Sequence, residues 1–95
     1  MALLVQKFGG TSLADFTCLE RVTDIICQAH SQGHDLVVVV SAMAGETDRL
    51  GTLAGKITKS PLKRELDVLL ASGEQVSVAL LTMALSERGI KARSY

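Results

Sequence analysis

Two consecutive glycines between a lysine and a pair of hydroxyl residues form the part of this sequence that is best suited to chemistry. The stretch covers residues 7–12 (KFGGTS), with Gly9 and Gly10 at its centre. Glycine has no Cβ, so the backbone of such a turn can approach a ligand closely. The free N–H groups of the turn, the N-terminus of a following helix and the charge of Lys7 all favour an anion. The stretch therefore predicts a site for the phosphates of a nucleotide.

A second interpretation of the same residues stays open. Their spacing is neither that of the G-x-x-x-x-G-K-[ST] loop nor that of the G-x-G-x-x-G turn, the two common phosphate-binding motifs. A plain tight turn, preceded by a solvated Lys7, fits the pattern as well. The elements around the turn therefore matter, because a phosphate site of this kind needs a strand before it and a helix after it.

The sequence predicts both of these elements. Residues 2–8 predict a first strand. Apolar side chains then repeat at helical spacing over residues 13–31, which predicts a helix with Thr11 or Ser12 as its N-cap. Residues 35–41 contain a continuous β-branched run, which predicts a second strand that is covered on both faces.

Short helices are predicted to follow the second strand. A loop of small residues covers residues 42–48, and a short helix follows over about 49–59. Ser60 and Pro61 predict the cap and the first turn of another helix, which ends near Ala71.

The last part of the chain predicts one more helix and one more strand. Ser72 and Gln75 have the spacing of a capping box, which predicts a new helix that Gly89 ends. Residues 90–95 predict the start of a third strand. This order of elements predicts an α/β fold, in which right-handed crossover helices join the strands of a parallel sheet.

Composition limits the classes of protein to which the chain can belong. With 95 residues it holds one domain at most. Basic and acidic residues number 10 each, so the formal net charge is 0, which argues against nucleic acid or an anionic membrane as a partner. Hydrophobic residues make up 47% of the chain and aromatic residues only 3%, which suits a buried parallel sheet.

The sequence also predicts a cytoplasmic protein. No run of apolar residues approaches the roughly 20 that a membrane-spanning helix needs. The N-terminus lacks the pattern of a signal peptide, and two cysteines indicate a reduced setting rather than a disulfide framework. Cys27, His30 and His34 suggest metal spacing, but Gly33 separates the histidines, so no metal site is predicted. No Ser/His/Asp or Cys/His arrangement suggests a covalent nucleophile.

Three polar segments are expected to meet at one edge of the sheet. Crossover helices run antiparallel to the strands, so their N-termini lie at the carboxyl edge, where open α/β sheets bind ligands. The segments are residues 9–12, 41–47 and 72–74. Together they suggest a phosphate site next to a site for a small substrate that carries an amine.

A simpler interpretation exists for each charged or polar residue of these segments. Glu74 in the first turn of a helix often only stabilises the helix dipole. Glu46 and Asp48 are equally compatible with solvated loop charges, and Ser41 with the end of a strand.

Three stretches of the sequence resemble the aspartokinases, of the amino-acid kinase superfamily. They are residues 7–12 (KFGGTS), 38–50 (VVVSAMAGETDRL) and 64–76 (RELDVLLASGEQV), in the order found in that family. The first string is specific, because other members of the superfamily usually carry a shorter and different glycine turn. The resemblance covers essentially the whole chain.

The resemblance implies a phosphoryl transfer. Aspartokinases transfer the γ-phosphoryl of ATP, accompanied by Mg²⁺, to the side-chain carboxylate of L-aspartate. The product is 4-phospho-L-aspartate, which opens the synthesis of lysine, threonine and methionine. The resemblance implies that Lys7 contacts the transferring phosphoryl together with the backbone of Phe8, Gly9 and Gly10, and that Ser41 lies beside the phosphate site.

The same resemblance implies where the acceptor binds. Gly45 and Thr47 would line the aspartate pocket, and Glu74 would take the ammonium of the substrate. It also implies a homo-oligomer in the complete protein.

Aspartokinases continue well past the length of this chain, so residues 1–95 are expected to be the N-terminal part of a larger three-layer catalytic domain. In that family, the part that follows the matched segment holds the base and ribose pocket, an arginine for the substrate carboxylate and the regulatory ACT domains. Two functions stay open: the catalytic N-terminal part of an aspartokinase, or a non-catalytic truncated fragment that at most binds phosphate or a partner chain. A kinase for a different small carboxylate is a third option.

Overall fold

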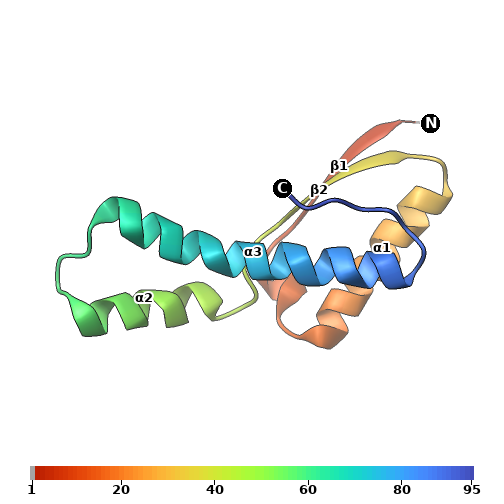
Figure 1. The fold of residues 1–95 in the computed structure, drawn as a ribbon. Helices are drawn as coiled ribbons and strands as arrows, with labels where there is room; N and C mark the ends of the chain where they lie inside the picture. Colours follow the sequence, from red (N-terminus) through yellow and green to blue (C-terminus); the bar gives the residue numbers. More distant parts are fainter. Residues whose placement is uncertain (1) are drawn as a thin grey trace.

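The computed structural model describes residues 2–95, which form a two-stranded parallel sheet and three α-helices (Figure 1). In chain order the elements are β1 (Leu3–Phe8), a 3-10 turn η1 (Gly10–Leu13), α1 (Phe16–Ser31), β2 (Asp35–Val40), α2 (Glu46–Ile57) and α3 (Lys63–Glu87). The predicted α/β class is confirmed, as are both strands and the helix between them. The expectation that the second strand is covered on both faces is wrong for the described residues, because Val37 and Val39 are exposed. The predicted short helix begins three residues earlier than expected, at Glu46.

The glycine turn delays the start of α1. The N–H of Ser12 donates to the carbonyl of Gly9 at 3.1 Å, so residues 10–13 form a separate 3-10 turn. Asp15 then caps α1, because its carboxylate accepts from the N–H of Cys18 at 2.9 Å. The expected cap at Thr11 or Ser12 is therefore wrong, since both residues are used inside the turn.

One apolar core lies against one face of the sheet. The side chains that alternate inward from β2 meet the apolar stripe of α1 and the second half of α3. The buried members of this core are Leu13, Leu19, Val22, Ile26, Val40, Leu81 and Leu85. Side chains of opposite parity point to the other face, which no element among residues 2–95 covers; Leu3, Val5, Val37 and Val39 are about half to two-thirds exposed there.

Residues 63–87 form a single long helix, and the expected break at Ser72 is wrong. The hydroxyl of Ser72 donates back to the carbonyl of Leu69 at 2.5 Å instead of capping a new helix. Gly73 keeps helical geometry. Because it has no side chain, residues 42–50 can pack closely against it. By length and composition alone α3 is long and apolar enough to cross a membrane, in contrast to the sequence-based expectation. It packs against α1, α2 and β2.

Residues 90–95 form no strand in the described chain, in contrast to the sequence-based expectation. The N–H of Ile90 donates to the carbonyl of Leu85 at 3.0 Å, which closes the end of α3. The segment then runs beside β2 across a cavity of about 300 Å³ that Leu36 and Val38 also line. It therefore faces side chains of β2 and does not pair with the edge of that strand.

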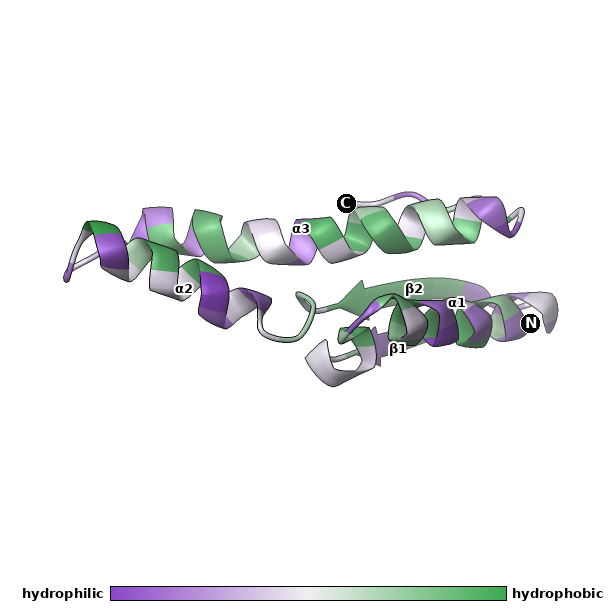
Figure 2. Cartoon of the chain, turned by 90° about the horizontal axis from the view of Figure 1, so that it is seen from below, coloured by the Kyte–Doolittle hydropathy of each residue, from purple (hydrophilic) through white to green (hydrophobic). Residues whose placement is uncertain are grey.

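The helical pair formed by α2 and the first half of α3 projects away from the sheet (Figure 2). The chain measures 50 × 24 × 18 Å, and its radius of gyration is 15.3 Å. A compact domain of this length has a radius of gyration of about 12 Å. The shape is thus elongated, and the middle of α3 lies where the projecting pair leaves the sheet (Figure 1).

Candidate functional site

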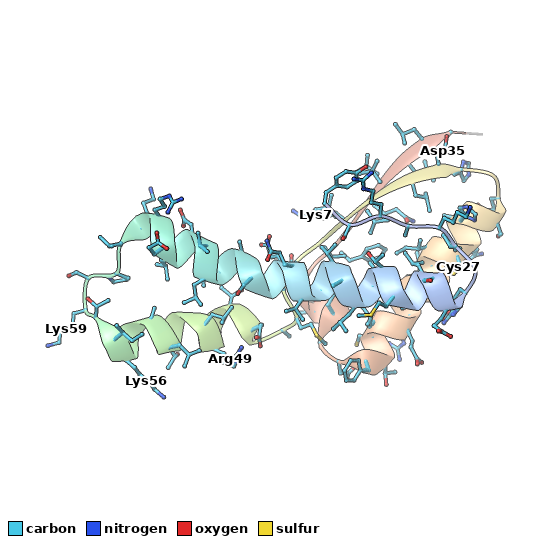
Figure 3. All side chains as sticks on the ribbon, in the orientation of Figure 1. Lys7, Cys27, Asp35, Arg49, Lys56 and Lys59 are labelled. Carbon is cyan, nitrogen blue, oxygen red and sulfur yellow. The ribbon has the colours of Figure 1, made fainter. Side chains whose placement is uncertain are left out.

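The glycine turn follows directly from the end of β1. Lys7 pairs in register with Val39 of the neighbouring strand and lies on the exposed face of the sheet. Phe8 points the other way and packs against the core. Figure 3 shows Lys7 beside the sheet, apart from the cations along α2. The alternation of β1 therefore separates an anchoring Phe8 from a free Lys7 immediately before Gly9.

The segment after β2 is tied to this turn. The N–H of Ser41 donates to the carbonyl of Phe8 at 3.2 Å, which extends the parallel ladder beyond β2. The next residues of the two segments also lie close together, because a Cβ added at Gly10 would lie 3.5 Å from the carbonyl oxygen of Ala42. The turn and residues 41–44 are therefore in contact, and Ser41 lies next to the glycines.

Gly45 redirects the chain into α2. Its φ of 81° is left-handed, a conformation in which other residues are strained. The N–H of Glu46 donates to the carbonyl of Met43 at 3.0 Å, and Thr47 follows, exposed, in the first helical turn. Gly45 thus places the N-terminus of α2, with Thr47 on it, close to the end of β2.

An ion pair closes the first turn of α2. Arg49 Nη2 lies 2.5 Å from Glu46 Oε1, and Arg49 Nε lies 3.1 Å from the same oxygen. This hydrogen bond lowers the pKa of Glu46 and raises that of Arg49. From the sequence, Glu46 was compatible with a solvated loop charge, and no role was predicted for Arg49. The i, i+3 spacing of the two residues was the available signal, but the helix had been expected to begin only at residue 49.

Glu74 lies in the middle of a helix and not at its end. Since α3 begins at Lys63, Glu74 lies about three turns into it. The interpretation of Glu74 as a first-turn dipole residue is therefore wrong. Its side chain borders a hollow of about 310 Å³ that Val39 and Val40 at the end of β2 also line.

Close packing at Gly73 holds this part of α3 against the loop. A Cβ added there would lie 3.2 Å from Ala42 Cβ, 3.3 Å from Leu50 Cδ1 and 3.4 Å from Glu46 Cγ. All three segments expected at the carboxyl edge of the sheet therefore meet. The ion pairs found among residues 2–95 involve neither Lys7 nor Glu74.

The arrangement suits phosphoryl transfer. A backbone turn without side chains and a free lysine can grip a phosphate, and hydroxyls and a free carboxylate lie on the adjoining segments. Such a reaction needs positioning and charge neutralisation, and no covalent nucleophile from the protein.

Comparisons with known proteins point the same way. Residues 2–95 match the family model described as the amino acid kinase family. The chain is 56% identical to the aspartate kinase of Pseudomonas putida and 50% identical to aspartokinase 2 of Bacillus subtilis, over 95 residues in each case. Both alignments cover 100% of this chain and 23% of the relative, so the chain spans about a quarter of their length.

Solved structures share the fold. The crystal structure of aspartate kinase from Synechocystis superposes with a TM-score of 0.94 at 46% identity, covering 100% of this chain and 16% of that one. Aspartokinase III of E. coli, in complex with aspartate and ADP, superposes with a TM-score of 0.77 at 26% identity, covering 100% of this chain and 31% of that one.

Proposed function

The chain belongs to the amino acid kinase family, and we propose that it is the N-terminal part of an aspartate kinase catalytic domain. In this proposal the γ-phosphoryl of ATP passes to the side-chain carboxylate of L-aspartate, which gives 4-phospho-L-aspartate and ADP. One observation carries the proposal: the glycine turn, residues 41–47 and the Gly73 region of α3 are packed together at the carboxyl edge of the sheet.

The turn after β1 forms the phosphate side of the proposed site. Lys7 neutralises charge that develops on the transferring phosphoryl, and the backbone at Phe8, Gly9 and Gly10 approaches its oxygens. Ser41 lies beside the same phosphate, as its hydrogen bond to Phe8 supports. This placement matters because phosphoryl transfer is catalysed mainly by electrostatic stabilisation and alignment.

The loop after β2 and the middle of α3 form the acceptor side. Gly45 and Thr47 line the aspartate pocket, and the free carboxylate of Glu74 takes the substrate ammonium. The structure of the E. coli relative in complex with aspartate and ADP supports a site for an acceptor beside a site for a nucleotide in this proposal.

ATP brings Mg²⁺ with it. Among residues 2–95 no three His, Cys, Asp or Glu side chains cluster as a metal site, so this proposal leaves the ion on the ATP phosphates. The ion would neutralise phosphate charge, while Lys7 adds a fixed positive charge from the protein. We place the protein in the cytoplasm, in the synthesis of lysine, threonine and methionine, and expect a homo-oligomer when the domain is complete.

The alternative is a non-catalytic fragment that binds phosphate or a partner chain. The elongated shape and the uncovered face of the sheet favour it for residues 1–95 taken alone. Both functions are compatible with one fold, because the difference lies in whether the rest of the catalytic domain is present.

A chimera tests the proposed function. In this hybrid protein, called the chimera, residues 1–95 replace the matching segment of the Pseudomonas putida aspartate kinase. Formation of aspartyl hydroxamate is then measured with ATP and Mg²⁺. We expect activity that depends on L-aspartate and fails with succinate, which lacks the amine. A soluble, folded chimera without aspartate-dependent activity contradicts the proposal.

A further inference from the structure

Ala42 lies between two glycines that belong to different elements. Its carbonyl oxygen would lie 3.5 Å from a Cβ at Gly10, and its own Cβ would lie 3.2 Å from a Cβ at Gly73. Ala42 itself is 5% exposed. The glycine turn, the loop after β2 and the middle of α3 thus stack through one small buried residue.

Gly73 differs from the other glycines in the helices. A glycine in a helix interior is less favourable than alanine, so its presence there calls for a reason. Gly51 and Gly55 of α2 have no heavy atom within 4 Å of an added Cβ. At Gly73, by contrast, three neighbours lie at 3.4 Å or less, and all of them belong to residues 42–50.

The close approach at Gly73 has a consequence for the residue that follows it. Glu74 shares the backbone of Gly73, so the separation of α3 from Ala42 and Glu46 also sets where the Glu74 carboxylate stands. A methyl group at Gly73 would move α3 or the loop by a few tenths of an ångström. The carboxylate would then shift relative to Gly45 and Thr47.

We propose that Gly73 is a positioning residue, which by lacking a side chain sets the distance between α3 and the acceptor loop and so places Glu74 for the substrate ammonium. This inference rests on the proposed function. It assigns to Gly73 no contact with the substrate. It predicts that a single added methyl group affects the acceptor and leaves the nucleotide largely unaffected.

The first test is Gly73→Ala in the chimera. We expect the KM for aspartate to rise about tenfold, because small misplacements of a binding group are costly. The KM for ATP should stay within about twofold, since the glycine turn keeps its contact with Ala42. Gly51→Ala and Gly55→Ala are the matched controls and should leave both constants unchanged. An unchanged aspartate KM in Gly73→Ala, or an equal rise in both constants, overturns the inference.

The second test removes the methyl group of Ala42 and adds one at position 73. Ala42→Gly removes the Cβ that lies nearest to position 73, and the two other close atoms, Leu50 Cδ1 and Glu46 Cγ, belong to longer side chains that can move. The double variant Ala42→Gly, Gly73→Ala should therefore regain an aspartate KM within about threefold of the unmodified chimera. A purely destabilising effect of Gly73→Ala would lower the thermal midpoint without this recovery in KM. Failure of the double variant to recover overturns the inference, whereas an inactive unmodified chimera overturns the proposed function.

Discussion

At the scale of single residues, Lys7 carries the clearest chemical assignment. It is exposed on the sheet beside the glycine turn, and none of the ion pairs found in residues 2–95 includes it. Lys7→Ala in the chimera should lower kcat by about 100-fold or more, because one transition-state donor is lost. The KM for aspartate should change little, since Lys7 acts on the phosphoryl.

Lys56→Ala is the matched control for that variant. Lys56 lies in the last turn of α2, on the projecting helical pair, and Figure 3 shows it far from Lys7. Its removal should leave kcat unchanged. Near-normal turnover in Lys7→Ala would show that Lys7 is a solvated strand residue.

Glu74 gives a prediction about affinity instead of rate. A charged hydrogen bond to the substrate ammonium is worth about 1.5–3 kcal/mol, so Glu74→Gln should raise the aspartate KM by about 10-fold to 100-fold. The KM for ATP should remain unchanged. Steady-state titration of aspartate at saturating ATP measures the effect.

Glu65→Gln serves as the control for Glu74→Gln, because Glu65 lies in the first turn of the same helix and pairs with Arg64. It should alter neither KM. If both variants behave alike, Glu74 is only a solvated charge on α3.

At the scale of the elements, the cap of α1 predicts a pH dependence. The N–H of Cys18 donates to Asp15, and this hydrogen bond lowers the pKa of Asp15 below its ordinary value of about 3.9. A carboxylate with a lowered pKa stabilises the helix above its unfolded pKa, and this contribution is lost as the pH falls through the lowered value. Helix content should therefore decrease below about pH 4.

A peptide of residues 13–32 allows the cap to be measured by circular dichroism between pH 2 and 7. Asn caps helices about as well as Asp but carries no charge. In Asp15→Asn we expect the part of the acid transition due to this residue to disappear. Identical pH curves for the two peptides would exclude a contribution of the ionised Asp15 carboxylate to the cap.

At the scale of the whole molecule, residues 1–95 alone should be inactive. They supply a phosphate turn and part of an acceptor pocket, and positioning accounts for about 7–11 kcal/mol of barrier reduction only in a complete site. We expect no aspartyl hydroxamate from the purified chain. Robust ATP-dependent formation of the hydroxamate would contradict this.

The same chain should associate with itself, because apolar side chains on the open face of the sheet are exposed. Val5 is 69% exposed there and Val37 is 48% exposed. Sedimentation velocity should show oligomers whose amount rises with concentration and falls in Val5→Lys. Gln28→Lys, on an exposed position of α1, is the control and should leave association unchanged.

The sequence by itself determined the strand, turn and helix order around the glycines, because these are local patterns. Alternation and helical periodicity act over a few residues, and the residues of KFGGTS predict a turn without reference to any distant part of the chain. The α/β class and the three segments at one edge of the sheet followed from the same local signals and from the handedness of crossovers.

Only the tertiary structure decided the course of α3. Ser72 and Gly73 have the local signature of a helix boundary, but Ala42, Glu46 and Leu50 pack against Gly73 and the helix continues. These contacts join residues about 23 to 31 positions apart, so no window of sequence contains them. The place of Glu74 in mid-helix follows from that packing, because burial of a close contact outweighs the weak preference of single residues for a helix end.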